Sequence, residues 1–419
     1  MRYFYRLLLY LIFPYLFLRL YWRSRNLPAY RERLGERLGC YSFTLEKCIW
    51  IHAVSVGEVV AAIPLVKALK ARYVDIPFLI TTMTPTGAAR VKAELGESVK
   101  HVYLPYDFPF AVKRFLTAMN PRKGIIMETE LWPNLVAICH QKKIPLYLLN
   151  ARLSEKSAQG YRYIAPLMRA MLNQLELIAA QGQADAERFI ALGASKERVV
   201  VTGNIKFDLT LPSNLVEKSH ELRAMLGHNR WIWIAASTHE GEEELLLAAH
   251  KKLREKNPTA LLILVPRHPQ RFNEVATLCE QQGWKIARRS QQQICTSETA
   301  VYLGDTMGEL LLLYAAAEVA FVAGSLIKHG GHNLLEPAAL GKPILTGPHT
   351  FNFAEINALF LAANALVVTT DVEALAKELE RLMLHPEDAK QLGRSALQVM
   401  EANRGALRRQ LEIISSKLY

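Results

Sequence analysis

The chain has 419 residues, 51% of them hydrophobic and 21% charged, which excludes a disordered protein and predicts roughly two or three globular domains. Five scattered cysteines without CxxC or Cys/His spacing argue against a disulfide scaffold or a metal site and predict reduced thiols in a cytosolic compartment. The net charge is +12, and residues 1–40, with eight arginines and two glutamates, carry a surplus of six. This basic segment predicts an anionic partner, either a membrane surface or an acidic substrate, whereas no recognised motif supports nucleic-acid binding.

The N-terminal segment is predicted to attach the chain to a membrane. Leu7 to Leu18 is an uncharged apolar run of 12 residues between Arg6 and Arg19, with Pro14 inside it. Aromatic side chains around the run suit the headgroup region. Because a span needs about 20 apolar residues, a short or tilted span and a helix lying in the interface both stay open, as does a buried core helix. The arginines after the run predict that the rest of the chain stays in the cytoplasm.

Past residue 45, short apolar strands alternate with amphipathic helices. Runs that are buried on both faces indicate parallel strands with helical crossovers. The first series of predicted strands is Cys48–Val54, Phe78–Thr82, His101–Leu104, Gly124–Glu128, Leu146–Leu149, Leu177–Ala180 and Val199–Val201. After a polar break at Leu209–Asn214, the second series is Trp231–Ala236, Leu261–Val265, Val301–Leu303, Val319–Val322 and Pro343–Leu345. From residue 370 onward the sequence predicts only helices.

Two successive Rossmann-like units with doubly wound sheets account for this order of elements. Such units bind ligands at the carboxyl ends of their strands. We therefore predict an α/β protein in three parts: a membrane anchor at 1–26, an N-terminal Rossmann-like domain at 27–208, and a C-terminal one at 209–419 that includes the terminal helices. The two domains are expected to face a cleft.

Polar side chains follow strands of the first half at three places. Glu58, in Ser55-Val56-Gly57-Glu58, either faces the cleft or closes a capping box with Ser55. Glu128 and Glu130 follow the fourth strand, where two carboxylates could raise each other's pKa or cap the helix after Pro133. Lys206, in Gly-Asn-Ile-Lys-Phe-Asp at the domain junction, could stabilise charge on a leaving phosphate or simply be solvated.

Three loops of the second half suit a nucleotide. Pro266-Arg267-His268-Pro269 ends a strand, and its arginine offers a planar fork for phosphate. Gly304–Leu310 follows the next strand, with Asp305 or Thr306 as a helix cap and the backbone of residues 307–309 left to meet a base or ribose. A third loop, at Gly330–Pro337, also suits a nucleotide. Three such loops in one half of the chain are stronger evidence for a nucleotide site than any one of them alone.

The third loop is Gly330-Gly331-His332-Asn333-Leu334-Leu335-Glu336-Pro337. It predicts a glycine turn that opens onto a helix, whose N-terminus attracts phosphate. Asn333 and Glu336 are expected at i and i+3 on one helix face, where a carboxylate can accept hydrogen bonds from ribose hydroxyls. An ordinary turn and helix is the alternative for this loop taken alone.

Other chemistries lack their motifs in this sequence. No GxSxG for a serine hydrolase and no P-loop occurs. No Asp-x-Asp pair is present to hold a metal–diphosphate, so a metal-free transferase acting on a sugar nucleotide is favoured.

With these residues in view, the chain resembles the 3-deoxy-D-manno-octulosonic acid (Kdo) transferases of Gram-negative lipopolysaccharide synthesis. The likeness spans the chain and follows the apolar N-terminus with SVGE at 55–58, METELWPN at 127–134, GNIKFD at 203–208, PRHP at 266–269, GDTMGEL at 304–310 and GGHNLLEP at 330–337. The resemblance implies the GT-B glycosyltransferase fold and an inverting transfer of Kdo from CMP-Kdo to the anionic lipid A precursor (lipid IVA). It places the enzyme at the cytoplasmic face of the inner membrane, with no cofactor and no metal.

The same resemblance assigns roles to single residues. Glu58 matches the family's catalytic base, and Glu128 and Lys206 match positions assigned to transition-state stabilisation. The matching CMP-binding positions are Pro266, Arg267, Met307, Gly308, Glu309, Asn333, Leu334, Leu335 and Glu336. The rival interpretations are a UDP-sugar transferase or a sugar-nucleotide 2-epimerase on the same fold, and a non-catalytic membrane scaffold with a vestigial nucleotide site.

Overall fold

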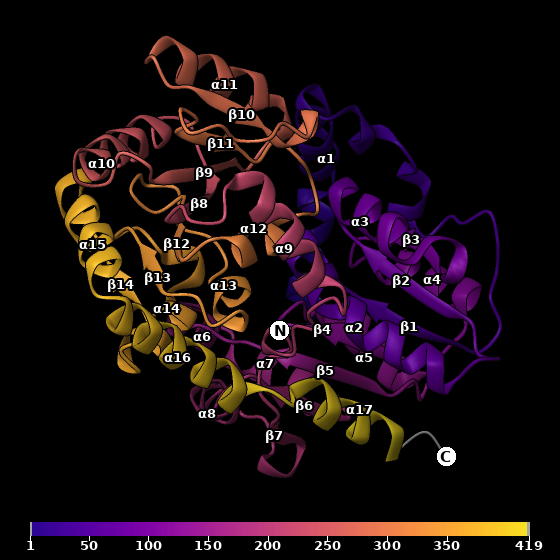
Figure 1. Cartoon of the computed structure of the whole chain (residues 1–419). Helices are drawn as coiled ribbons and strands as arrows, with labels where there is room; N and C mark the ends of the chain where they lie inside the picture. Colours follow the sequence, from indigo (N-terminus) through magenta and orange to yellow (C-terminus); the bar gives the residue numbers. More distant parts are fainter. Residues whose placement is uncertain (1, 417–419) are drawn as a thin grey trace. The chain divides into compact units, whose positions relative to one another are not determined.

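The computed structural model describes residues 2–416, which form two compact units (Figure 1). Unit 1 contains the described residues up to Asp208 together with those from Arg404 onward, and unit 2 is Leu209–Asn403. Each unit is built on one seven-stranded, fully parallel sheet, so the predicted α/β class with two Rossmann-like halves is confirmed.

The sheet of unit 1 has the strand order β3-β2-β1-β4-β5-β6-β7. Its strands are β1 (Cys48–His52), β2 (Phe78–Thr82), β3 (Lys100–Tyr103), β4 (Pro121–Met127), β5 (Leu146–Ala151), β6 (Leu177–Ala180) and β7 (Val199–Val201). The helices of this unit are α1 (Arg2–Asn26), α2 (Val56–Arg72), α3 (Pro85–Leu95), α4 (Pro109–Met119), α5 (Pro133–Gln141), α6 (Glu155–Arg162), α7 (Ala165–Leu172), α8 (Gln183–Ala191) and α17 (Ala406–Ser416).

The sheet of unit 1 is apolar on both faces because successive strand residues point to opposite sides. Ile49 and Ile51 of β1 belong to one core cluster, whereas Trp50 belongs to the other. Gly124 of β4 makes room for Trp50, since a Cβ at this glycine would lie 2.4 Å from Leu146 and 2.7 Å from Trp50. The side-chain pattern therefore forces helices onto both faces of the sheet.

The sheet of unit 2 has the order β10-β11-β9-β8-β12-β13-β14. Its strands are β8 (Ile232–Thr238), β9 (Leu261–Pro266), β10 (Ile286–Arg288), β11 (Val301–Leu303), β12 (Val319–Val322), β13 (Ile344–Thr346) and β14 (Val367–Val368). The helices are α9 (Leu215–Leu226), α10 (Glu243–Lys256), α11 (Phe272–Gln281), α12 (Leu310–Ala316), α13 (Leu335–Ala339), α14 (Ala354–Ala362), α15 (Val372–Leu384) and α16 (Pro386–Asn403). The edge strands β10 and β14 were not among the predicted strands, because β10 has only two apolar residues before Arg288 and β14 is two residues long.

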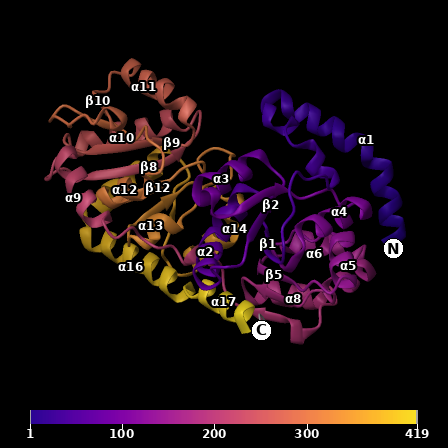
Figure 2. The same cartoon turned by 90° about the vertical axis from the view of Figure 1, so that its right-hand side faces the viewer.

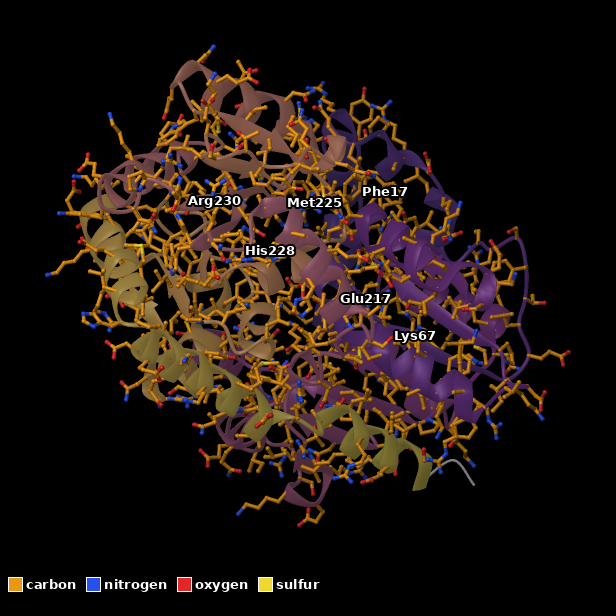
Figure 3. All side chains as sticks on the ribbon, viewed as in Figure 1. Phe17, Lys67, Glu217, Met225, His228 and Arg230 are labelled. Atoms are coloured by element: carbon orange, nitrogen blue, oxygen red, sulfur yellow. The ribbon has the colours of Figure 1, made fainter. Side chains whose placement is uncertain are left out.

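Helix α1 lies along the outside of unit 1 (Figure 2). It is 25 residues long, continues through Pro14, and is long and apolar enough to cross a membrane by length and composition alone. Only 6% of its most apolar window is buried. One face nevertheless packs on the body: the ring of Phe17, labelled in Figure 3, lies 6.2 Å from that of Tyr106, and Phe13 lies 5.2 Å from Phe108.

Helix α17 belongs to unit 1, which corrects its expected place in the C-terminal domain. Asp208 accepts hydrogen bonds at 2.6 Å from the backbone N–H groups of Gly405 and Leu407, and thereby caps this helix. Arg409 donates to the carbonyl of Thr202 at 2.7 Å. An amphipathic pattern shows that a helix covers a core but not which core, so the sequence could not place α17.

We predict that Asp208→Ala will lower the free energy of unfolding by about 1–2 kcal/mol, the usual effect of losing a helix cap. Denaturant unfolding followed by circular dichroism measures the change, and amide exchange should show that α17 loses protection first. The control is Glu412→Ala, because Glu412 is exposed and reaches only Arg408, at 4.0 Å. Equal effects of the two substitutions would contradict the cap.

Candidate active site

The point where the strand order of unit 1 reverses lies between β1 and β4. The chain runs outward from β1 to β2 and β3 on one side, then returns to β4 on the other. Ligands of doubly wound sheets bind at this point, outside the carboxyl ends of the strands. Glu58 is in the first turn of α2, just after β1, and Glu128 is the residue after β4. Both predicted carboxylates therefore flank the expected ligand position of this unit.

Glu58 forms the capping box that the sequence allowed. Its Oε1 accepts hydrogen bonds from the backbone N–H of Ser55 at 3.3 Å and from the Ser55 hydroxyl at 2.8 Å. Its Oε2 accepts from the N–H of Val54 at 2.7 Å, and the N–H of Glu58 donates back to the Ser55 hydroxyl at 3.4 Å. The capping interpretation is thus confirmed, and the residue is only 7% exposed.

The same carboxylate lines a polar pocket of about 310 Å³. The other lining residues are Glu128, Thr129, Glu130, Arg152, Ser154 and Ser157. Burial raises the pKa of Glu58 to about 7, the hydrogen bonds from Val54 and Ser55 oppose this rise, and the charges of Glu130 and Glu128 add to it. A carboxyl group with a pKa near 7 can take up or release a proton at physiological pH.

Glu128 and Lys206, 78 residues apart in sequence, form an ion pair. The Nζ of Lys206 donates to Oε1 of Glu128 at 3.0 Å, and both side chains are partly buried. Glu128 has a φ of 57°, a left-handed conformation that is uncommon for a residue with a side chain. Such strained positions are concentrated at functional sites.

Two asparagine side chains bind the backbone of the loop that contains Lys206. The sequence did not single them out. The buried Oδ1 of Asn150, at the end of β5, accepts from the N–H of Ile205 at 3.0 Å. The Oδ1 of Asn204 accepts from the N–H of Lys206 at 3.0 Å. These contacts fix the backbone that presents Lys206 to Glu128.

The cap of α5 is Asp107, which rules out the idea that Glu128 and Glu130 cap this helix. The Asp107 carboxylate accepts from the backbone N–H groups of Asn134 and Leu135, both at 2.8 Å. Burial raises the pKa of Glu130, and the charge of Glu128 adds to this rise. Glu130 is therefore a pocket carboxylate and not a structural cap.

The corresponding reversal of strand order in unit 2 lies between β8 and β12. Loops after β8, β9 and β12 bring four histidines together: His239, His268, His329 and His332. The rings of His239 and His329 stack at 3.6 Å between centroids, and the Nε2 atoms of His239 and His332 lie 2.8 Å apart. Burial lowers the pKa of His239 to about 4 and that of His332 to about 3, so these two rings are neutral at pH 7.

Arg267 lies in this histidine cluster and close to Glu336. Its charge further lowers the pKa values of His239, His268 and His332, which burial already lowers. It also opposes the rise that burial gives to the pKa of Glu336. Two of the three predicted nucleotide loops, those of Arg267 and Glu336, therefore meet. Sequence reasoning missed the histidine cluster because its members come from three loops.

The helix predicted in the Gly330 loop begins later than expected. Helix α13 starts at Leu335, so Asn333 precedes it, and the expected shared face of Asn333 and Glu336 is wrong. The Oδ1 of Asn333 accepts instead from the N–H of Leu335 at 3.2 Å. The side chains of Leu334 and Leu335 are buried, so these two positions can meet a ligand only through their backbone.

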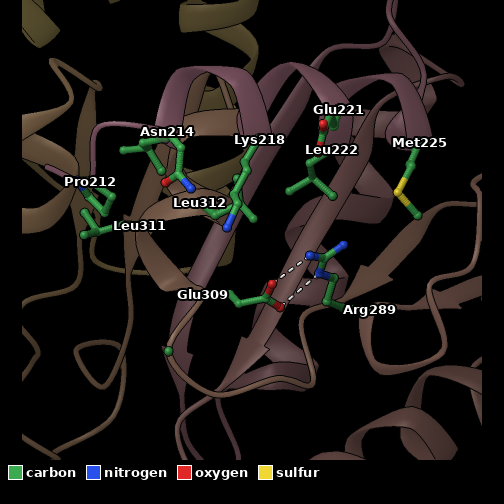
Figure 4. A pocket seen from close by; sticks show the side chains of 12 residues that line it. Pro212, Asn214, Lys218, Glu221, Leu222, Met225, Arg289, Glu309, Leu311 and Leu312 are labelled. Atoms are coloured by element: carbon green, nitrogen blue, oxygen red, sulfur yellow. Dashed lines mark hydrogen bonds and ion pairs between the residues drawn. The ribbon is translucent and has the colours of Figure 1, made fainter. Parts of the chain in front are cut away.

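Met307, Gly308 and Glu309 belong to a different part of unit 2. Gly308 and Glu309 line a pocket of about 380 Å³ beside α9, shown in Figure 4, whose lining residues include neither Arg267 nor Glu336. Met307 is exposed next to it. Glu309 forms a bidentate pair with Arg289 at 2.7 and 3.0 Å and accepts from the Thr306 hydroxyl at 2.6 Å.

The expected helix cap in this loop is also wrong. Glu309 itself occupies the position before α12, and Asp305 is buried and holds Arg288 and Ser290. Another unpredicted carboxylate, Glu242, accepts from the backbone N–H groups of Gly324, Ser325 and Leu326 at 2.7 to 3.0 Å. It thereby fixes the loop after β12. Within the described residues no group of three or more His, Cys, Asp and Glu side chains could hold a metal ion.

Comparisons with known proteins agree with this architecture. A family model described as 3-deoxy-D-manno-octulosonic-acid transferase matches residues 32–209, and one described as glycosyl transferases group 1 matches residues 229–399. The 3-deoxy-D-manno-octulosonic acid transferase of Haemophilus influenzae is 45% identical, over 100% of this chain and 99% of its own. The transferase of the same description from Bordetella pertussis is 37% identical, over 93% of this chain and 91% of its own.

Solved structures with low identity share the fold. A glycosyltransferase from Rickettsia africae is 15% identical with a TM-score of 0.57, covering 89% of this chain and 100% of its own. A UDP-GlcNAc 2-epimerase from Neisseria meningitidis is 14% identical with a TM-score of 0.60 and the same two coverages. Fold alone therefore does not separate transferases from epimerases.

The two parallel sheets and the matching domain models define a glycosyltransferase of the GT-B class. The relatives that match over the whole length narrow this class. The chain belongs to the family of 3-deoxy-D-manno-octulosonic acid transferases.

We predict that Glu58 makes stability depend on pH. Its folded-state pKa of about 7 lies above its ordinary value of 4.5, so its contribution is complete below pH 4.5 and is lost as the pH rises through 7. The difference in free energy of unfolding, wild type minus Glu58→Gln, should fall by roughly 3 kcal/mol between pH 4 and pH 8. Urea unfolding across this range measures it, and a difference that stays constant with pH would contradict the raised pKa.

Proposed function

We propose that the enzyme transfers Kdo from CMP-Kdo to the lipid A precursor, lipid IVA, with Glu58 as general base. The observation that carries this proposal is the pocket at the β1–β4 reversal, which contains Glu58, with a pKa of about 7, and Glu128, the ion-pair partner of Lys206. The whole-length family membership supports the transferred sugar.

The proposed reaction is a single displacement with inversion. The acceptor hydroxyl oxygen forms a bond to the anomeric carbon of Kdo, and the bond from that carbon to the CMP phosphate oxygen breaks. CMP leaves with the bonding electron pair, and Glu58 takes the hydroxyl proton. General-base help of this kind contributes roughly 10²–10⁴-fold.

Glu128 and Lys206 are proposed to stabilise the transition state. As the sugar becomes oxocarbenium-like, positive charge develops on the ring and negative charge on the leaving phosphate. A carboxylate and an ammonium group at 3.0 Å from one another offer both signs of charge, already oriented, in a partly buried position. Such groups need no reorganisation when the charges develop.

Unit 2 is proposed to bind CMP through Pro266, Arg267, Met307, Gly308, Glu309, Asn333, Leu334, Leu335 and Glu336. Arg267 is exposed beside neutral histidine rings, which suits a phosphate. CMP carries a single phosphate, and a guanidinium can neutralise its charge, so we propose that neither a metal nor a cofactor takes part.

We further propose that the enzyme works at the cytoplasmic face of the inner membrane. Helix α1 exposes apolar residues along most of its length, and arginines lie close to both of its ends. An anionic glycolipid whose acyl chains remain in the bilayer matches that basic, apolar surface.

We expect purified full-length protein to convert lipid IVA to a Kdo-bearing product that mass spectrometry detects, with CMP-Kdo as donor and EDTA without effect. The rate should rise with pH up to about 7 and then level off, because Glu58 must be deprotonated. Glu58→Gln should reduce the rate by about 10²-fold or more.

The matched control for that substitution is Ser55→Ala. It removes the partner of the capping box and keeps the carboxylate. If Glu58 were only a cap, Glu58→Gln would keep most of its activity, because glutamine also serves in a capping box, and Ser55→Ala would lose at least as much. A large rate loss in Glu58→Gln alone supports the base.

Arg267→Ala is expected to weaken CMP binding by about tenfold or more, because a charge-assisted bond to phosphate is lost. Calorimetry with CMP measures this change, and UMP serves as the competing nucleotide. Arg271→Ala is a poor control since Arg271 is bonded to Glu243 at 2.6 Å, so the exposed Lys328 is used instead as Lys328→Ala. Unchanged CMP affinity in Arg267→Ala, or equal affinity for UMP, would count against the assignment.

A further inference from the structure

Arg37 is a buried cation without a carboxylate partner in the described part of the chain. It lies on the short 3-10 helix at Leu34–Leu38 and is 1% exposed. One guanidinium nitrogen donates to the carbonyl of Met83 at 3.2 Å, and its buried Nε has no hydrogen-bond partner. The guanidinium carbon lies 4.5 Å from the ring centroid of Tyr103 and 5.9 Å from that of Tyr106. A buried charge is costly unless it is paired, so these neighbours leave room for an anion.

Arg37 lines a pocket of about 430 Å³ between α1 and the body of unit 1, which we call the α1 pocket. Two more arginines, Arg19 and Arg23, reach it from α1. The charges of all three arginines act on the phenol of Tyr106 and oppose the rise that burial gives to its pKa. The pocket thus brings three guanidinium groups close enough to influence the phenol of Tyr106, and such a group of arginines suits phosphate oxygens.

Besides the arginines, the α1 pocket has apolar walls and two carboxylates, Glu130 and Asp107, and that of Asp107 already accepts from Tyr5, Asn134 and Leu135. Leu9, Leu16 and Leu20 enter it from one face of α1, and Met83 and Trp132 enter it from the body. A phosphate-binding rim next to aliphatic and aromatic side chains matches an amphiphile better than a free anion. The volume lies in the range of small-ligand sites, roughly 300–1,000 Å³.

Helix α1 is fixed over the α1 pocket by contacts along its length. The hydroxyl of Tyr5 donates to Asp107 at 3.0 Å, and Arg6 donates to Asn134 at 2.8 Å. Near the other end of the helix, Arg31 donates to Ser24 at 2.7 Å. The helix therefore lies flat on unit 1 and does not project away from it.

The opposite face of α1 is an exposed apolar stripe. Its members, spaced alternately by four and three residues, are Phe4, Leu8, Leu11, Tyr15, Leu18 and Trp22. Residues at this spacing share one side of a helix. A bilayer that covers this stripe would bring lipid to the edge of the α1 pocket.

The α1 pocket shares residues with the candidate active site. Glu130 lines both this pocket and the pocket of Glu58 and Glu128. Val54 lines the α1 pocket and donates its N–H to the carboxylate of Glu58. A molecule bound under α1 would thus extend toward the proposed base.

We propose that the α1 pocket binds the phosphate-bearing, acylated end of the lipid acceptor. Arg19, Arg23 and Arg37 bind the phosphate, and the leucines of α1 hold the first part of an acyl chain whose remainder stays in the bilayer. The identity of this lipid rests on the proposed function. The pocket itself follows from the buried Arg37, which has no carboxylate partner among the described residues, and from the lining residues of α1.

The test measures binding of lipid IVA to the full-length protein in neutral detergent micelles, without donor, and compares it with dephosphorylated lipid IVA. Wild type should prefer the phosphorylated lipid by about tenfold or more. The double variant Arg19→Ala/Arg23→Ala, which changes exposed residues, should lose about this factor. The matched control is Arg25→Ala, an exposed arginine of the same helix that does not line the pocket.

Arg37→Lys provides a second variant, which keeps the charge and loses the planar fork. It should also weaken binding of the phosphorylated lipid, while calorimetry shows that CMP affinity and folding are retained. Equal binding of both lipids by wild type, or wild-type binding by the double variant, would overturn the proposal.

Flotation with phosphatidylglycerol vesicles separates lipid recognition from attraction to an anionic bilayer. A loss that appears on vesicles and not in micelles would assign the arginines to the bilayer surface and overturn the α1 pocket. Transfer assays keep the two proposals apart. Selective binding without any Kdo transfer would refute the proposed function alone, whereas transfer with an unchanged KM for lipid IVA in the double variant would refute the α1 pocket alone.

Discussion

The candidate site depends on how the carboxylate of Glu58 divides its hydrogen bonds. Burial raises its pKa, and the donors Val54 and Ser55 lower it, so that the two effects leave the pKa at about 7. A carboxylate has about four lone-pair sites, and three donors point at this one. The remaining site leaves room for one incoming proton. Capping and proton transfer are therefore compatible in a single side chain, because the cap orients the carboxylate that the pocket exposes.

The parallel sheets could be predicted because their strands are continuous apolar runs. β2, β6, β7, β11 and β12 have the predicted bounds, since each is a short run between polar segments. The sequence did not predict β10, whose run Ile-Ala-Arg is only partly apolar, or the two-residue β14, nor the return of α17 to unit 1. The latter depends on Asp208 binding two backbone N–H groups about 200 residues away in sequence, which no local pattern reveals.

The motifs indicated which residues matter but not how they meet. Glu128 and Lys206 are paired only because β4 and the loop after β7 end on the same edge of one sheet. Asp107 replaced Glu128 and Glu130 as the cap of α5, and Asn333 fell outside its helix by two residues. In each case a tertiary contact decided between alternatives that local spacing left open. The predicted nucleotide positions likewise divide between the histidine cluster and the pocket of Glu309.

Helix α1 shows why an apolar segment cannot be interpreted from hydropathy alone. Its length and composition suit a membrane span, yet one side of it packs on Tyr106 and Phe108 while the opposite side is exposed. A helix with two apolar sides can contact a bilayer and a protein surface at once. Arg37 lies beneath the packed side of α1. A buried guanidinium without a carboxylate partner lowers the stability of the fold unless an anion binds beside it. In the proposed α1 pocket, the packed side of α1 and the buried Arg37 act together on the same lipid.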